Sequence, residues 1–349
     1  HVDGILYPNF NNTLTQTGRL SSSEPNMQNI SKRNEFGKVL HSLFIAPEGW
    51  ACCQIDFSQL EIWVLAWLSN DLQLIEDLQN GVDLHVKRLQ YYNDKTYEEL
   101  FKLCKIDKDP YWDKQRTYAK TVSYQMAYGA QPKKVAESTG LDLSVVETIF
   151  AKEAETYSDT AALAVQVQES IKRTATFSKS IDIPRSSKGK NILGNVELLP
   201  VFDNYGNACY TNQEIRKVGY WTSPTGKKYH FLDSGRMTRN GLQRGFSFTQ
   251  PKNYPMQGSA ADIQGATTAA LLSMLLKKKD KIKMINEIHD SKWFYVRTDV
   301  LEPCLKELRS IIENVPKIML ERFNITVPFN FPVDIQIGSD FGDMYDWKG

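Results

Sequence analysis

Apolar residues along the chain are spaced in ways that predict a small number of well-defined elements. Trp50 to Asp56 is a short apolar run typical of a buried strand, and Leu60 to Leu68 then changes to helical periodicity. Two β-prone runs between Lys283 and Arg297 flank the polar triplet His289-Asp290-Ser291. This arrangement predicts a β-hairpin with a carboxylate at its tip.

The rest of the chain reads as helical stretches separated by turn-rich segments. Helices are predicted for residues 83–130 with a break near Asp109-Pro110, for 133–175 with breaks at 139–140 and 157–159, for 260–276, and for 301–323. Residues 1–50 and 177–245 are rich in turn-forming residues, and a second hairpin is expected from 219 to 232 around Pro224-Thr225-Gly226. Strands and helices do not alternate as βαβ units, so the predicted fold class is α+β.

Length and composition describe an ordinary globular chain. Its 349 residues suggest about two domains, and 41% of them are hydrophobic and 24% charged. No apolar run reaches the ~18 residues of a membrane span, and no signal peptide is evident. The five cysteines have no CxxC spacing, which argues against a zinc site and favours a reducing, cytoplasmic setting. Because residue 1 is His1, we expect the chain to start inside a larger reading frame or after processing.

Charge is uneven although the net charge is only +1. Residues 170–250 carry 13 Lys and Arg against 5 Asp and Glu. This excess could contact nucleic-acid phosphates, or it could belong to a long solvated loop region, and charge alone leaves both readings open.

Asp56 and Asp290 are the first candidates for chemistry, because each follows or joins a strand-like run. Two aspartates brought together repel unless cations lie between them, and two divalent ions about 3.5–4 Å apart could clamp an in-line phosphoryl transfer. Oxygen ligands favour Mg²⁺ over zinc. Taken singly, each aspartate is better explained as a turn or cap residue.

A basic and aromatic helix face lies between the two aspartates in sequence. Arg116, Lys120, Tyr124 and Tyr128 recur every four residues, so each step drifts by only about 40° and all four share one broad face. Arginine and lysine can grip a triphosphate, and aromatic rings can take a sugar and a stacked base. The alternative is an amphipathic helix with its tyrosines in the core.

Five ordered motifs resemble the family A DNA polymerases, the bacterial DNA polymerase I group. Asp56-Phe-Ser-Gln-Leu-Glu61 resembles motif A, Arg116 to Gly129 resembles motif B, and Ile288-His289-Asp290 resembles motif C. Two further blocks agree, at residues 17–30 and 255–262. The resemblance covers most of the chain. Membership of this group implies that the protein works in the cytoplasm of a bacterial or phage-infected host cell, with an organelle not excluded.

The resemblance implies roles for individual residues of the catalytic centre. Asp56, Asp290 and the Phe57 carbonyl would bind two Mg²⁺ ions, and Arg116 and Lys120 would hold the incoming dNTP, with Lys120 also donating a proton to pyrophosphate. The remaining residues expected beside the nucleotide are Tyr124 on the sugar, Tyr128 at the templating position, Glu61 as steric gate, His85 at the phosphates, Ser58 and Gln59. The residues expected to contact primer–template DNA are Arg19, Asn26, Gln28, Asn29, Gly129, Asn253, Gln257 and His289.

This chain departs from the family pattern at several positions. Ser291 stands where motif C usually has glutamate, which removes a charge next to the metal-binding aspartate. Glu287 replaces a common glutamine, Thr249 an arginine, and Trp63 the arginine that motif A usually reaches. Tyr124, where many relatives have phenylalanine, goes with easy acceptance of dideoxynucleotides.

The resemblance also implies an organisation into palm and fingers. The palm is expected at residues 1–72 and 248–349, the fingers at 73–247, with an insertion at about 177–218; the thumb and 3′→5′ exonuclease have no counterpart here. A second polypeptide could then carry those two domains. The alternatives to DNA synthesis are a non-catalytic subunit that binds primer–template and a relative of single-subunit RNA polymerases.

Overall fold

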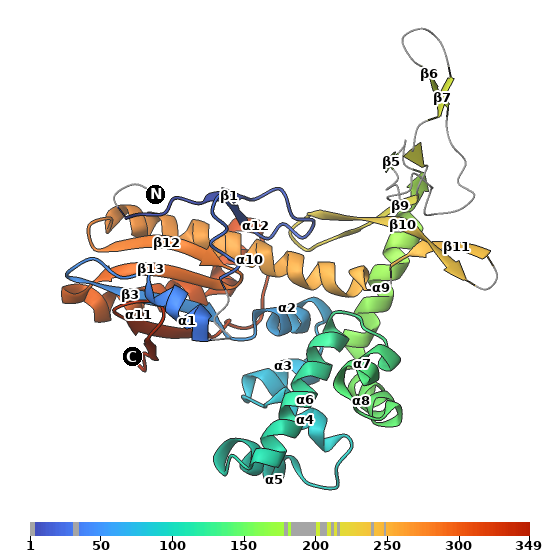
Figure 1. The fold of residues 1–349 in the computed structure, drawn as a ribbon, viewed down its shortest axis with the longest axis horizontal. Coiled ribbons are helices and arrows are strands. Elements are labelled where there is room, and N and C mark those ends of the chain that lie inside the picture. The colour runs from blue at the N-terminus through green and yellow to red at the C-terminus, as the bar shows by residue number, and fades with distance from the viewer. Residues whose placement is uncertain are drawn as a thin grey trace. The chain divides into compact units, whose positions relative to one another are not determined.

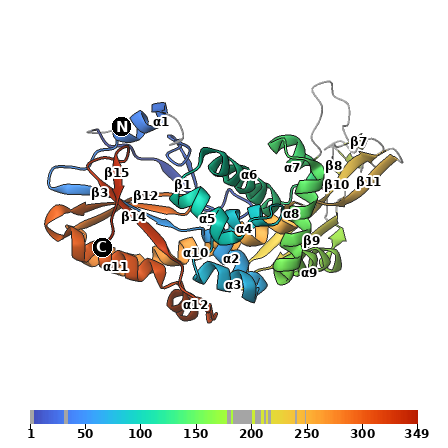
Figure 2. The same ribbon diagram turned by 90° about the horizontal axis from the view of Figure 1, so that it is seen from below.

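The computed structural model describes residues 4–30, 35–177, 181–182, 200–202, 208–210, 213–214, 217–238, 241–247 and 249–349. The chain forms two compact units, His1–Leu68 with Met256–Gly349, and Ser69–Pro255. Helices and antiparallel strands are both present and do not alternate as βαβ units, so the predicted α+β class is confirmed (Figures 1 and 2).

The first unit is built on a five-stranded antiparallel sheet. Its strand order is β12-β13-β3-β14-β15, with β12 at Ile282–Ile288, β13 at Ser291–Arg297, β3 at Trp50–Phe57, β14 at Val333–Gly338 and β15 at Met344–Asp346. The predicted strand at residue 50 and the predicted hairpin around His289-Asp290 are therefore confirmed. The second strand of this hairpin, β13, also pairs antiparallel with β3, from Ser291 opposite Asp56 to Arg297 opposite Trp50.

Alternation along β3 gives the sheet one strongly apolar face. Cys53, Ile55 and Phe57 are buried on it, opposite Ile337, Ile335 and Val333 of β14. Helix α11 (Leu301–Glu313) packs against β13 and β14 with Leu305, Leu308 and Ile312 buried at helical spacing. The other elements of this part are β1 (Asn9–Asn11), β2 (Ser21–Ser23), α1 (Glu35–Ser42), α2 (Leu60–Ser69), η2 (Thr298–Val300) and α12 (Val315–Phe323). Helix α10 (Gln250–Lys277) begins in the second unit and belongs to the first from Met256 onward.

The second unit is mainly helical. Its helices are α3 (Leu72–Gln79), α4 (Leu84–Gln90), α5 (Tyr97–Phe101), η1 (Lys102–Ile106), α6 (Pro110–Ala127), α7 (Pro132–Thr139), α8 (Leu143–Thr156) and α9 (Ser158–Thr174). Asp109 caps α6, with Pro110 in its first turn, and Gly140 ends α7 at φ +73°. The helix breaks predicted at these two positions are confirmed.

A four-stranded sheet of order β11-β10-β9-β4 completes the described part of this unit. It comprises β4 (Thr176–Phe177), β9 (Lys217–Thr222), β10 (Lys228–Thr238) and β11 (Gly241–Phe246). Two separate two-stranded pairs lie between β4 and β9 in sequence: β5 (Ile181–Asp182) with β8 (Gln213–Glu214), and β6 (Pro200–Phe202) with β7 (Ala208–Tyr210). The β9–β10 hairpin confirms the turn expected at Pro224-Thr225-Gly226. The expected insertion at 177–218 lies for the most part outside the described residues.

Several details differ from the sequence-based expectations. Residues 1–50, expected to be turn-rich, contain α1 and a short β1–β2 pair. The single helix expected from 301 to 323 is two helices, because Asn314 separates α11 from α12 and caps the latter. In the described part of the chain, no helix is long and apolar enough to cross a bilayer.

Candidate active site

Asp56 and Asp290 lie next to each other at one end of the five-stranded sheet. The backbone N–H of Phe57 donates to the carbonyl of Asp290 at 3.3 Å, and Asp56 stands directly opposite Ser291 in the β3–β13 ladder. The hairpin turn closes tightly because His289 adopts φ +56°. Burial raises the pKa of Asp290, while its own backbone and the charges of His289 and Arg19 act in the opposite direction. A cation beside this carboxylate would therefore be stabilising.

The oxygen donors at this end of the sheet suit Mg²⁺. No group of three or more His, Cys, Asp or Glu side chains able to hold a metal occurs among the described residues. Magnesium is ordinarily held in such sites by one or two protein carboxylates together with waters and substrate phosphates. Asp56 and Asp290, with the Phe57 carbonyl, fit that requirement.

A third carboxylate, Asp334, escaped the sequence-based prediction. In the β3–β14 ladder, Asp334 stands directly opposite Asp56. Side chains that stand opposite each other on neighbouring strands lie on the same face of the sheet, so the Asp334 and Asp56 carboxylates share one face. The Ser58 hydroxyl donates to Asp334 Oδ2 at 2.6 Å. Nothing in the local sequence around residue 334 distinguishes it, because the neighbourhood arises only when β14 pairs with β3.

Ser291, the residue in place of the usual glutamate, is buried and engaged. Its hydroxyl accepts a hydrogen bond from Trp293 Nε1 at 2.9 Å, and it is 6% exposed. Ser291 thus completes a polar contact within β13 and adds no negative charge opposite Asp56.

The predicted steric gate is held by a predicted DNA-contact residue. Arg19 forms an ion pair with Glu61 in the first turn of α2. Gln59, just before this helix, is exposed and adopts φ +57°. Motif A and the Thr17-Gly18-Arg19 block are therefore brought together as side-chain partners.

The remaining predicted DNA contacts of the first unit differ in their surroundings. His289 is exposed at the hairpin tip, and Asn26 and Asn29 are also exposed. Gln28 is buried, and its side-chain amide donates to the Glu287 carbonyl at 2.8 Å, so it fastens its segment to β12. Gln257 is half-buried on α10.

Lys120, Tyr124 and Tyr128 of the basic and aromatic face of α6 are exposed. Tyr124 is 52% exposed and Tyr128 is 38% exposed, whereas Ala119, Val122 and Ser123 are the buried residues of this helix. Lys120 places its ammonium 5.9 Å from the centre of the Tyr124 ring. The reading in which the tyrosines pack in the core is therefore wrong.

Arg116 is held by Asp83, a residue that the sequence analysis did not single out. Nε and Nη2 of Arg116 donate to Asp83 Oδ2 at 2.9 and 2.6 Å. The other oxygen, Oδ1, caps α4 by accepting from the backbone N–H groups of His85 and Val86. The Val-Asp-Leu-His sequence carries an N-cap signature that could have revealed half of this role.

His85, on the first turn of α4, is neutral at pH 7. Burial, together with the positive charges of Arg88, Arg116 and Lys120, lowers its pKa to about 4 against the opposing effect of Asp83. Its Nδ1 lies 3.0 Å from the Ser123 hydroxyl on α6. His85 can thus contact a phosphate by a hydrogen bond but not as a cation.

Gly129 and Asn253 both lie in tightly packed surroundings in the second unit. Gly129 adopts φ +80°, and a Cβ there would lie 2.9 Å from the Cα of Thr249. Only glycine accommodates both constraints. The Oδ1 of Asn253 is buried without a hydrogen-bond partner among the described residues.

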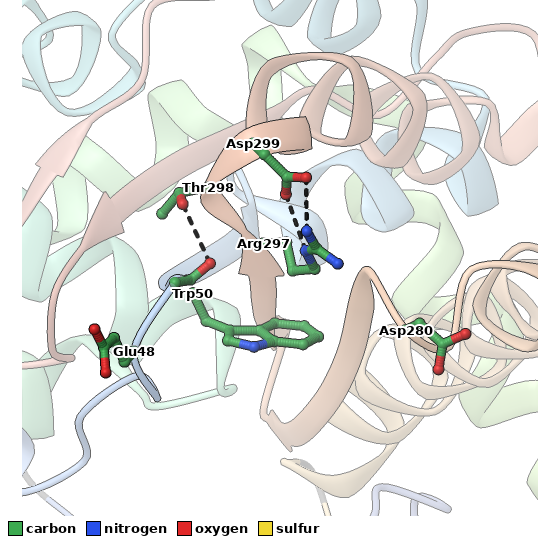
Figure 3. A pocket seen from close by; sticks show the side chains of 7 residues that line it. Glu48, Trp50, Asp280, Arg297, Thr298 and Asp299 are labelled. Atoms are coloured by element: carbon green, nitrogen blue, oxygen red, sulfur yellow. Dashed lines mark hydrogen bonds and ion pairs between the residues drawn. The ribbon is translucent and has the colours of Figure 1, made fainter.

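A shallow pocket of about 320 Å³ lies elsewhere, lined by Glu48, Gly49, Trp50, Asp280, Arg297, Thr298 and Asp299. Figure 3 shows Arg297 paired with Asp299 at its rim. Because Arg297 opposes Trp50 while Ser291 opposes Asp56, six residues of strand, or roughly 20 Å, separate this pocket from the two aspartates. The pocket does not belong to the candidate active site.

Comparison with known proteins connects these features. Residues 1–343 match the family model described as DNA polymerase family A. The thermostable DNA polymerase I of Thermus filiformis is 27% identical over 335 residues, 96% of this chain and 32% of that protein. DNA polymerase I of Bacillus subtilis (strain 168) is 27% identical over 339 residues, 97% of this chain and 31% of that protein. The chain thus spans about a third of the length of these relatives.

Among solved structures, the POL domain of Pol1 from M. smegmatis, in complex with DNA primer-template and dNTP, is similar in fold. It superimposes with a TM-score of 0.67 at 21% identity, covering 98% of this chain and 49% of that chain. At this identity the likeness establishes the fold alone.

Proposed function

Because the chain belongs to DNA polymerase family A, we propose that it catalyses template-directed DNA synthesis, joining a nucleotide from a dNTP to a primer 3′-OH. The observation that carries this proposal is the placement of Asp56 beside Asp290, from two motifs far apart in sequence, at one end of one sheet. Primer–template DNA and dNTP are the proposed partners, and a cytoplasmic setting goes with them. Neither the structure nor the comparisons support the second polypeptide considered above.

The carboxylates would act through bound metal. Two Mg²⁺ ions, held by Asp56, Asp290 and the Phe57 carbonyl, would stabilise the charge on the attacking and leaving oxygens. Asp56 is fixed by pairing on both sides of β3, and Asp290 by the turn that His289 closes. Both carboxylates are therefore held by rigid parts of the sheet, as an in-line phosphoryl transfer requires.

The second unit would supply the nucleotide contacts. Arg116 and Lys120 bind the triphosphate, and Lys120 donates a proton to the leaving pyrophosphate. Neutral His85 contributes a hydrogen bond to a phosphate, and Tyr124 and Tyr128 offer exposed rings to the sugar and base. In the first unit, Glu61, held by Arg19, excludes a ribose 2′-OH.

Contacts to DNA in this proposal are independent of sequence. Arg19, Asn26, Asn29, Gln257 and His289 reach the primer–template through backbone and minor-groove atoms, which report pair shape and not base identity. The palm would comprise residues 1–72 and 248–349, and the fingers 73–247.

The test is primer extension with Asp56→Asn and Asp290→Asn. Each substitution keeps the size of the side chain and removes the charge, so extension should be lost while primer–template binding, measured by fluorescence anisotropy, stays at the wild-type level. Asp299→Asn is the matched control, because Asp299 is exposed and lies at the opposite end of the same sheet. Normal extension by either active-site variant would refute the metal assignment.

The same assay separates the two other readings. Preference for rNTP over dNTP on one primed template would contradict the role of Glu61 and indicate an RNA polymerase relative. Binding of primer–template by wild type without any extension would indicate a non-catalytic subunit.

A further inference from the structure

Lys292 is a lysine buried in the sheet, immediately after Ser291 and two residues after Asp290. It is 1% exposed, and its side chain leaves β13 on the face opposite to Ser291. Its ammonium donates to Glu287 Oε2 at 2.8 Å, to Gln264 Oε1 at 2.7 Å and to Thr268 Oγ1 at 2.7 Å. A fourth acceptor, the Gln264 carbonyl, lies at 3.3 Å. Every donor of the ammonium is therefore satisfied within the protein.

Glu287 is the centre of this cluster, which we call the Lys292 network: Lys292, Glu287, Gln264 and Thr268. Glu287 stands directly opposite Lys292 in the β12–β13 ladder and also accepts from the Thr268 hydroxyl at 2.6 Å. Its backbone carbonyl accepts from the Gln28 side chain. The network therefore ties both strands of the hairpin to α10, and through Glu287 to the segment that contains Gln28.

The place of the network in the ladder relates it to the candidate active site. The Glu287–Lys292 rung is followed directly by the Ile288–Ser291 rung, and the latter closes the His289-Asp290 turn. A change in the first rung is transmitted to the turn across a single pair of residues. Ser291 is also the residue opposite Asp56, so the same rung sets the turn against β3.

A contribution to folding stability is a weak explanation for a buried ion pair such as that of Lys292 and Glu287. Removing two charges from water is costly, and apolar residues of similar size often replace a buried ion pair without loss of stability. What an ion pair with several directed hydrogen bonds adds is a defined geometry, since each bond fails if the strands or the helix shift.

We propose that the Lys292 network is a positioning device that fixes the depth and orientation of the His289-Asp290 turn, and so holds Asp290 at a set place beside Asp56. The inference rests on the proposed function, in which those two aspartates hold metal. Lys292 and Glu287 are positioning residues, since neither is placed in contact with substrate. Because Ser291 carries no charge, the position of Asp290 depends on the Lys292 network, which holds the hairpin from the opposite face of the sheet.

The experiment compares two variants of the ion pair, one that removes both charges and one that removes only the carboxylate charge. Glu287→Gln with Lys292→Met is the principal variant, and Glu287→Gln alone is the second, because its amide oxygen still accepts from Lys292. Lys278→Met with Glu307→Gln is the matched control, since that ion pair joins the residue that follows α10 to α11 and is partly exposed. Thermal melts establish that each variant is folded.

Two readouts follow the turn itself. Binding of Mn²⁺ alone, by electron paramagnetic resonance without DNA or dNTP, should weaken about 10-fold in the double variant, by a smaller factor in Glu287→Gln, and stay unchanged in the control. Backbone amide exchange of residues 288–291 should accelerate in the double variant. Under the proposed function, the extension kcat should fall while the KM for dNTP stays near wild type.

Wild-type Mn²⁺ affinity and wild-type exchange at the turn in both Glu287 variants would overturn the inference. Loss of Mn²⁺ binding in the control to the same extent would also overturn it, because the effect would then be general. The wild-type chain's own extension activity decides the proposed function separately, since the Mn²⁺ and exchange measurements need no catalysis.

Discussion

One carboxylate, that of Asp83, orients both Arg116 and the start of α4. Its Oδ2 receives Nε and Nη2 of the guanidinium, and its Oδ1 receives the first backbone N–H groups of the helix that carries His85. Burial alone would raise the pKa of Asp83, but the hydrogen bonds and charge of Arg116 lower it overall. Asp83, which the sequence analysis did not identify, thus orients both Arg116 and His85, two residues predicted to contact the triphosphate.

Asp83→Asn and Asp83→Ala should separate these two roles. Asparagine caps a helix about as well as aspartate, so Asp83→Asn removes only the ion pair and should cost about 1.5–3 kcal/mol of unfolding free energy. Asp83→Ala also removes the cap and should cost about 1 kcal/mol more. Urea unfolding at pH 7 measures both. Equal stability of Asp83→Asn and wild type would show that the ion pair contributes nothing.

The buried imidazole of His85 should make the protein less stable in mild acid. Its pKa is lowered from 6.5 to about 4, so between these values the unfolded chain binds a proton that the folded chain does not. Stability should therefore fall as pH decreases from 6.5 towards 4. His85→Gln removes the titrating group, and urea unfolding at several pH values should show a shallower fall for this variant. Parallel curves would contradict the lowered pKa.

Two glycines in the second unit offer a matched pair for testing close packing. Gly140→Ala meets open space at φ +73°, so it should cost only the left-handed backbone penalty, roughly 1–2 kcal/mol. Gly129→Ala adds a contact of 2.9 Å with the Thr249 Cα at a similar φ, and this contact is with backbone that cannot rotate away. Gly129→Ala should be clearly the more destabilising in urea unfolding. Equal losses would mean that the chain relaxes around residue 129 without cost.

Elements defined by local pattern were predictable from the sequence. The strand at Trp50, the hairpin around His289-Asp290 and the helix containing Ala260 follow from apolar runs, polar turns and the absence of breakers over short windows. Asp56 and Asp290 were identified because their motifs are local, and the structure places them side by side.

Relationships that depend on strand pairing or on distant segments were not predictable. Asp334 becomes a neighbour of Asp56 only through β14, and nothing near it in sequence marks it. Lys292 follows a polar turn and would be expected in solvent, yet its acceptors on α10 lie 24 and 28 residues before it. Burial of a charged side chain depends on which partners the fold assembles, and a window of sequence does not contain them.

The pairing of β3 with β13 also restricts how this part of the chain can change in length. Successive side chains of a strand alternate between faces, so losing one residue inside β3 would turn the Asp56 position towards the side that Ile55 occupies. The ladder does accommodate an irregularity between Met284 and Asn286, but on β12, the edge strand, where it leaves Asp56 and Ser291 in register. A single-residue insertion or deletion should therefore be tolerated better on the edge strand β12 than within β3 or β13.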